Sequence, residues 1–135
     1  MRLPSDAALI VIEGSAGADP AAEAVIAALV AAWREERLPV FAIRAGAAFA
    51  ETERELEGIG ATTLVVCGAS VEATVRTAAG LGYRAFVVED ACWSAGGMRA
   101  LAGMEAKVVD GATARAAARR ARARERWKAA RLGGV

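Results

Sequence analysis

Residues 62–94 read TTLVVCGASVEATVRTAAGLGYRAFVVEDACWS, and this stretch decides the fold. Two short apolar runs rich in β-branched residues, 62–66 and 84–88, flank a segment with helical character over 71–79. Apolar runs of this kind with glycine nearby predict buried strands, so the stretch predicts a βαβ unit. Sites in open parallel sheets collect at the carboxyl ends of the strands. We therefore expect a site in the loops after Cys67 and after Asp90.

The alternation of strands and helices continues on both sides of this unit. Asp19 and Pro20 provide an N-cap and a proline for the first helical position, which predicts the start of a helix there. Alternating strands and helices with short connections indicate an α/β sheet with right-handed crossovers. The further elements expected are strands over 7–12, 39–43 and 106–109, helices over 20–37, 51–57 and 112–132, and a short helix or turn over 96–103.

The composition of the 135 residues is that of one globular domain, with 56% hydrophobic and 24% charged residues. The longest apolar stretch, 21–33, contains Glu23 and is too short to span a bilayer. The first residues lack the apolar region of a signal peptide. The two cysteines lack metal-type spacing. We therefore expect a cytoplasmic protein with reduced thiols and no membrane partner.

The chain contains no histidine. This excludes catalysis by Ser-His-Asp or Cys-His arrangements and argues against a transition-metal site. The glycines form neither a Walker motif nor a dinucleotide fingerprint. We therefore expect no metal and no cofactor, and any acid–base chemistry falls to other side chains.

The net charge of +1 conceals an uneven distribution. Residues 112–135 contain eight basic residues and one acid, a charge of +7, which leaves −6 for residues 1–111. The narrow alanine stripe of this basic helix is expected to bury little surface. A basic helix can bind nucleic acid or other anions, or it can act as a solvated arm that meets the acidic body of its own or a neighbouring subunit. We favour the second interpretation, because Trp127 is the only aromatic residue in this segment.

The chain resembles the isochorismatase-like hydrolases, the superfamily that includes nicotinamidases and carbamoylsarcosine-type amidohydrolases. The resemblance spans roughly residues 7–110 and is most specific between Phe49 and Ser94. Four features carry it: ALIVIE over 8–13, the Phe49…Thr52…Leu56 pattern before GIGATTLVVCG over 58–68, the turn Thr74-Val75-Arg76, and GYR…VVEDACWS within 82–94.

The resemblance implies a three-layer αβα, Rossmann-like sandwich and an oligomeric assembly. The segment that would hold one of the family's six strands is shortened here. We therefore expect a mostly parallel five-stranded sheet, in the order 2-1-3-4-5, within residues 1–111. The basic helix over 112–135 packs on this domain or extends from it, and Trp127 is our candidate for an interface between copies.

The family's chemistry requires a cysteine nucleophile at a helix N-terminus, an aspartate after the first strand and a lysine. Here Thr74 stands at the nucleophile position and Glu13 at the aspartate position, and no lysine precedes Lys107. Arg44 is the nearest cation to the missing lysine, but an arginine does not give up its proton. The resemblance therefore implies a shortened, divergent member without the cysteine triad.

Each candidate site residue also has a purely structural interpretation. Glu13 can act as a base or simply pair with Arg44, and Thr74 can act in catalysis or merely begin a helix. The cysteines Cys67 and Cys92 are interpreted as small packing residues. The candidates for ligand contact are Phe49 and Trp93, which can instead belong to the core, and the segment Gly68, Ala69 and Ser70 before the helix whose backbone N–H groups form the family's oxyanion hole.

Three functional hypotheses follow. The favoured one is a non-catalytic member that binds a small ligand in the remnant pocket or supports a partner subunit. The second is an active hydrolase of a small amide or another C–N bond, with Thr74 as nucleophile or water-positioning group, Glu13 as base and Arg44 as electrostatic support. The third is a nucleic-acid or anion-binding module acting through the basic C-terminal helix.

Overall fold

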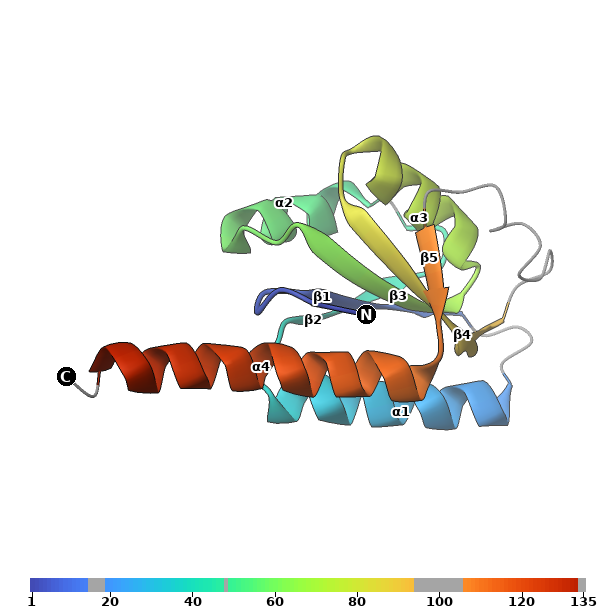
Figure 1. Cartoon of the computed structure of the whole chain (residues 1–135). Helices are drawn as coiled ribbons and strands as arrows, with labels where there is room; N and C mark the ends of the chain where they lie inside the picture. Colours follow the sequence, from blue (N-terminus) through green and yellow to red (C-terminus); the bar gives the residue numbers. More distant parts are fainter. Residues whose placement is uncertain (15–18, 48, 94–105, 134–135) are drawn as a thin grey trace.

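A computed structural model describes residues 1–14, 19–47, 49–93 and 106–133 of the chain (Figure 1). The helix or turn expected over 96–103 lies outside the described residues. Asp19 caps the first helix as expected, since its carboxylate accepts the Ala21 N–H at 3.0 Å and Pro20 opens the helix. The elements are β1 (Ala8–Glu13), α1 (Pro20–Glu35), β2 (Val40–Arg44), α2 (Ala50–Ile59), β3 (Thr63–Ala69), α3 (Val71–Gly80), β4 (Arg84–Trp93), β5 (Ala106–Val109) and α4 (Gly111–Gly133).

The five strands form one parallel sheet in the order β2-β1-β3-β4-β5. The predicted strand order is therefore confirmed. All seven residues of β3 are buried, as expected for a central parallel strand that is covered on both faces. Because all the strand pairs are parallel, all carboxyl ends lie at one edge of the sheet.

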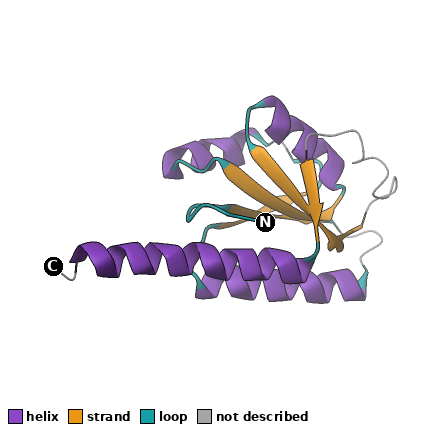
Figure 2. Cartoon of the chain, in the orientation of Figure 1, coloured by secondary structure: helices purple, strands orange, loops and turns teal. Residues whose placement is uncertain are grey.

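Helices cover both faces of the sheet and make three layers (Figures 1 and 2). α1 and α4 lie on one face, where Leu29 and Trp33 of α1 pack against Phe86 of β4. α2 and α3 lie on the other face, where Leu56 and Val75 are fully buried. The predicted α/β sandwich is confirmed. None of the described helices is both long enough and apolar enough to cross a membrane.

Two strands run further than the sequence predicts. β3 continues to Ala69 instead of ending at residue 66, and β4 continues to Trp93 instead of ending at residue 88. The expected loops after Cys67 and Asp90 therefore begin later than predicted. The polar residues Glu89 and Asp90 suggest a strand end, but they are exposed at an irregularity of the β3–β4 pairing, after which the strand resumes.

The first half of α4 belongs to the core, which corrects the expectation that its alanine stripe buries little. Because alanine has no long side chain, α4 approaches α1 closely, and its β-carbons are shielded completely. Gly111 marks this approach, since a β-carbon there would lie 2.5 Å from Cγ1 of Val25. The buried alanines are Ala114, Ala117, Ala118 and Ala121.

The second half of α4 extends past the end of α1 (Figure 1). Its arginines contact the body of the same chain: Arg126 forms an ion pair of 3.1 Å with Glu36 of the segment after α1. Arg124 donates a hydrogen bond to the carbonyl of Leu3. Trp127 is 61% exposed, and Cζ of Arg131 lies over its ring, 5.1 Å from the ring centroid. The second half of the basic helix therefore contacts its own subunit through an ion pair and a hydrogen bond to a backbone carbonyl.

Candidate functional site

The carboxyl edge of the sheet carries two of the predicted site residues side by side. Glu13 ends β1 and Arg44 ends β2, and they are partners in the register of these strands. Both side chains are exposed. No ion pair joins them within the described residues. Among the described residues, no ion pair occupies the carboxylate of Glu13.

A pocket of about 300 Å³ opens between the end of β1 and α1. Glu13 and Trp93 both line it, so the fold brings together two of the predicted site residues. Glu23 and Ile26 of α1 also line it and were missed by sequence reasoning. The signal for Glu23 was available, because Asp19 and Pro20 fix the start of α1 and place Glu23 in its first turn. The remaining described lining residues are Val11, Ile12 and Gly14.

The charge of this pocket restricts what it can hold. Its described lining includes the carboxylates of Glu13 and Glu23 and no basic side chain. A second negative charge brought into such a pocket is repelled by both carboxylates. The pocket therefore suits a neutral or cationic molecule that offers N–H or O–H donors.

Trp93 contributes an unpaired donor. Its Nε1 is buried and has no hydrogen-bond partner among the described residues. A buried indole N–H usually finds an acceptor, because leaving it unpaired costs the hydrogen bond it would make with water. By contrast, the other buried indole, Trp33, donates to the carbonyl of Ala7 at 3.0 Å. The N–H of Trp93 is therefore a donor whose acceptor is not supplied by the described protein atoms.

Thr74 lies on the other side of the sheet from this pocket. It is the fourth residue of α3, which covers the same face as α2, whereas the Glu13 pocket lies against α1. The alternation of side chains along β1 points Glu13 to the same face as Leu9, which belongs to the core beneath α1 and α4. Within the described residues, no side-chain hydrogen bond connects Thr74 with Glu13, and Thr74 is absent from the described lining of the Glu13 pocket.

Backbone hydrogen bonds and strand pairing hold the segment before α3 in place. Ser70 has a left-handed φ of 48° and its side chain does not cap α3. Its N–H donates to the carbonyl of Trp93 at 3.1 Å, and Ala69 pairs with Trp93 in the sheet. Gly68 has a φ of 108° and lies against β1. These residues support Trp93 from the neighbouring strand and are absent from the described lining of the Glu13 pocket.

Phe49 lies outside this pocket. It is 8% exposed and packs in the core beneath α2 and α3. Its ring meets that of Tyr83 edge-on, with centroids 6.3 Å apart. This geometry is that of a packed aromatic pair.

Neither cysteine has the properties of a nucleophile. Burial, together with the neighbouring Cys92, raises the pKa of Cys67 to about 12, and its thiol lies 3.6 Å from the carbonyl of Ile10, to which it donates. Burial also raises the pKa of Cys92 to about 12. Because the thiolate is the reactive form, both residues stay unreactive thiols at neutral pH. Among the described residues, no cluster of acidic and cysteine side chains could hold a metal ion.

Comparison with known proteins identifies the central half of the chain. A family model described as the isochorismatase domain matches residues 46–113, from the segment before α2 to the first turn of α4. This match includes Thr74 and Trp93 and excludes Glu13. No protein of curated function matches the sequence. Since the family model covers half of the chain and the sheet has the expected order, the chain belongs to the isochorismatase family.

Proposed function

We propose that this member of a hydrolase family binds a small neutral molecule of the carboxamide type in the Glu13 pocket and does not hydrolyse it. One observation carries the proposal: Trp93, whose buried N–H has no acceptor among the described residues, lines a pocket that also contains the carboxylate of Glu13. A primary amide offers the two groups that such a pocket can bind. Its carbonyl accepts from Trp93, and its NH₂ donates to Glu13.

The selectivity follows from charge and size. Glu13 and Glu23 repel a carboxylate, so an amide is preferred over the corresponding acid. The apolar side chains of Val11 and Ile26 suit a small hydrocarbon or aromatic body. A volume of about 300 Å³ fits a molecule of the size of benzamide.

The absence of hydrolysis is supported by the nucleophiles available. By the resemblance, Thr74 stands at the position of the family's cysteine, and both cysteines of the chain have pKa values near 12. A threonine hydroxyl needs a base to lose its proton, and Thr74 is absent from the described lining of the pocket that contains Glu13. The lysine that would lower the nucleophile's pKa is missing, because the first lysine is Lys107.

The proposal is tested by calorimetric titration with benzamide and with benzoate. We expect benzamide to bind and benzoate to bind at least about tenfold more weakly, because it brings a negative charge toward two carboxylates. Trp93→Phe keeps the ring but removes the N–H, and it should weaken benzamide binding roughly three- to tenfold. Trp127→Phe, on the exposed half of α4, is the matched control and should change nothing. Equal binding of benzoate, or no effect of Trp93→Phe, would contradict the proposal.

A second assay distinguishes an active hydrolase from the proposed binding without hydrolysis. Ammonia release from a panel of small amides and ureas is measured for the unchanged chain, for Thr74→Ala and for Thr77→Ala. Thr77 is the control because it lies on the same helix, and its hydroxyl donates to the carbonyl of Ala73 at 2.9 Å. We expect no turnover in any of the three. Turnover that is lost only in Thr74→Ala would replace our proposal with a threonine-dependent hydrolase.

A further inference from the structure

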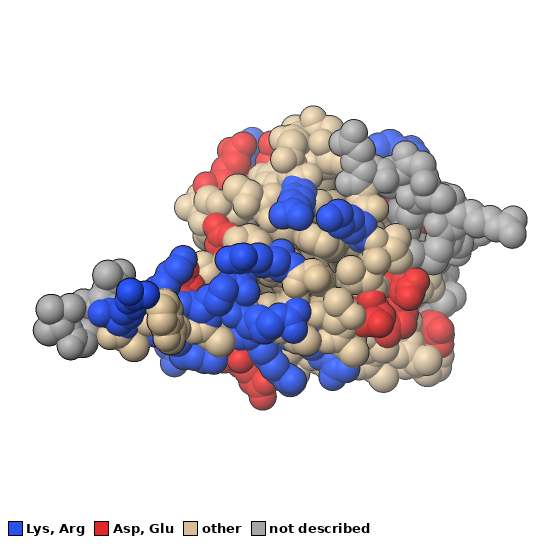
Figure 3. All heavy atoms as spheres, viewed as in Figure 1, with Lys and Arg blue, Asp and Glu red and all other residues tan. Residues whose placement is uncertain are grey.

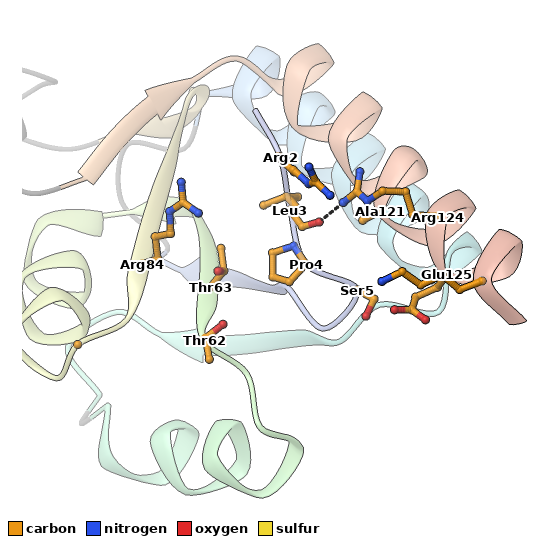
Figure 4. Close-up of a pocket in the computed structure, with 12 residues that line it drawn as sticks. Arg2, Leu3, Pro4, Ser5, Thr62, Thr63, Arg84, Ala121, Arg124 and Glu125 are labelled. Atoms are coloured by element: carbon orange, nitrogen blue, oxygen red, sulfur yellow. Dashed lines mark hydrogen bonds between the residues drawn. The ribbon is translucent and has the colours of Figure 1, made fainter. Parts of the chain in front are cut away.

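The opposite edge of the sheet contains a larger pocket, of about 680 Å³ (Figure 4). It lies between the N-terminal segment, the amino ends of β3 and β4, and α4. Because the strands are parallel, it is separated from the Glu13 pocket by the length of the sheet. Its described lining residues are Arg2, Leu3, Pro4, Ser5, Thr62, Thr63, Gly82, Arg84, Ala121, Arg124, Glu125 and Lys128.

Four of these side chains are cationic and one is acidic. The cations come from three separate parts of the chain: Arg2 from the N-terminal segment, Arg84 from β4, and Arg124 and Lys128 from α4. Within the described residues, none of the four forms an ion pair. Figure 3 shows lysines and arginines gathered along α4 and on the sheet beside it. The pocket is therefore a concentration of positive charge without a matching set of carboxylates.

The positive charge continues into an adjoining pocket of about 550 Å³. The two pockets share Arg2 and Arg84, and the second adds Lys107 of β5. A molecule bound at Arg84 can therefore extend in either direction and still meet a cation.

Two of the guanidinium groups are held in place before any ligand arrives. Arg124 donates to the carbonyl of Leu3 across the pocket, which fixes its head group beside the N-terminal segment (Figure 4). The guanidinium of Arg84 lies over the ring of Phe86, 5.6 Å from its centroid. Groups that are already positioned lose little freedom when a ligand binds. The hydroxyls of Ser5, Thr62 and Thr63 add neutral donors.

We propose that this pocket binds a small anion with two or more phosphate groups. Arginine forks and a lysine ammonium are the side chains that bind phosphate oxygens best, because they supply several charge-assisted N–H donors. Four cations without an ion-pair partner among the described residues repel one another in one pocket, and a ligand with several negative charges relieves this repulsion. The volume of the pocket fits a diphosphate with an attached organic group. A concave pocket also encloses a small molecule better than a flat surface does.

The test uses inorganic pyrophosphate as the probe, with calorimetric titration of the full chain at low and at physiological ionic strength. We expect one site per chain and an affinity that falls as salt screens the charges. Arg84→Gln and Lys128→Gln should each weaken pyrophosphate about tenfold, since each removes a charged donor. Glu125→Gln should strengthen binding, because it removes the carboxylate of the pocket.

The matched control is Arg119→Gln, an exposed position of α4 that is absent from the described lining of both pockets. It removes the same charge and should leave the affinity unchanged within about twofold. Equal weakening by Arg119→Gln would show a general effect of net charge and would overturn the proposal. If Arg84→Gln fails to fold, as judged by circular dichroism, the exposed Lys128→Gln carries the comparison.

A second arm tests a single-stranded RNA oligonucleotide. If oligonucleotide binding persists in Arg84→Gln and disappears in Arg131→Gln, the anion-binding site lies on the protruding half of α4. That result would overturn the proposal of a phosphate-binding pocket. Absence of pyrophosphate binding to the unchanged chain would overturn it as well. Pyrophosphate binding that requires Arg84 and Lys128 but not Arg119 establishes it.

Discussion

Gly68 of β3 lies so close to Ile12 of β1 that a β-carbon at residue 68 would be 2.2 Å from the Ile12 carbonyl oxygen. The same glycine has a φ of 108°, in a region that other residues rarely adopt. Two central strands therefore approach each other closely at Ile12, one residue before Glu13. This contact helps to fix where Glu13 stands at the carboxyl edge of the sheet.

Gly68→Ala is expected to be strongly destabilising, because the added methyl group meets backbone atoms that cannot turn aside. Overlap and the unfavourable φ together should cost about 3 kcal/mol or more. The measurement is urea unfolding followed by circular dichroism. Gly58→Ala is the control, since a β-carbon there meets no atom within 4 Å. A Gly68→Ala protein with unchanged stability would show that β1 and β3 are further apart than described.

Ala118→Leu tests the close packing of α4. Ala118 is fully buried in the core between α4 and the sheet, so three extra carbons force α4 outward. We expect a loss of about 1–3 kcal/mol in the free energy of unfolding. Ala129→Leu, on the exposed part of the same helix, should change stability by less than about 0.5 kcal/mol. Equal effects of the two substitutions would indicate that α4 does not pack as described.

The two buried thiols predict a loss of stability at alkaline pH. Between about pH 9 and 12, Cys67 and Cys92 keep their protons in the folded chain and lose them in the unfolded chain. The unfolded state then binds fewer protons, so stability falls as pH rises, by up to roughly 1.4 kcal/mol per pH unit for each thiol. Unfolding free energies measured from pH 8 upward should show this slope, and a variant with both cysteines changed to alanine should show a shallower one. Identical slopes would contradict the prediction.

Trp127 remains our candidate for an interface between copies of the chain. Its side chain is 61% exposed on the half of α4 that extends past α1. If copies associate there, Trp127→Ala should shift the mass measured by light scattering toward the monomer. Arg119→Ala, on the packed half of the helix, is the control. A mass that is the same for the unchanged chain and for Trp127→Ala would exclude this role of Trp127.

The sequence predicts the sheet well because strand and helix signals recur with clear boundaries. Asp19 and Pro20 indicate the start of α1, and the buried run before Cys67 indicates a central strand. The family resemblance supplied the strand order, which the structure confirms. Expectations failed where a local pattern had two meanings. Glu89 and Asp90 resemble the end of a strand, although they mark an irregularity within β4.

The candidate site was only partly accessible to sequence reasoning. Glu13 follows from the end of the first strand, but its partnership with Glu23 depends on how α1 lies across the sheet. The N–H of Trp93 has no acceptor among the residues that the structure describes, and which acceptors surround a side chain cannot be predicted from the sequence. The packing of α4 was underestimated because each alanine adds little apolar area. In the structure, the small alanine side chains allow α4 to lie close to α1.

The arrangement of α4 has a consequence for how the protein is made. α4 is synthesised after all five strands, yet its alanines complete the core on the face that α1 only partly covers. Until residues 114–121 have left the ribosome, apolar side chains such as Val65 and Phe86 lack this cover. The nascent chain therefore exposes apolar surface that chaperones can bind until α4 docks.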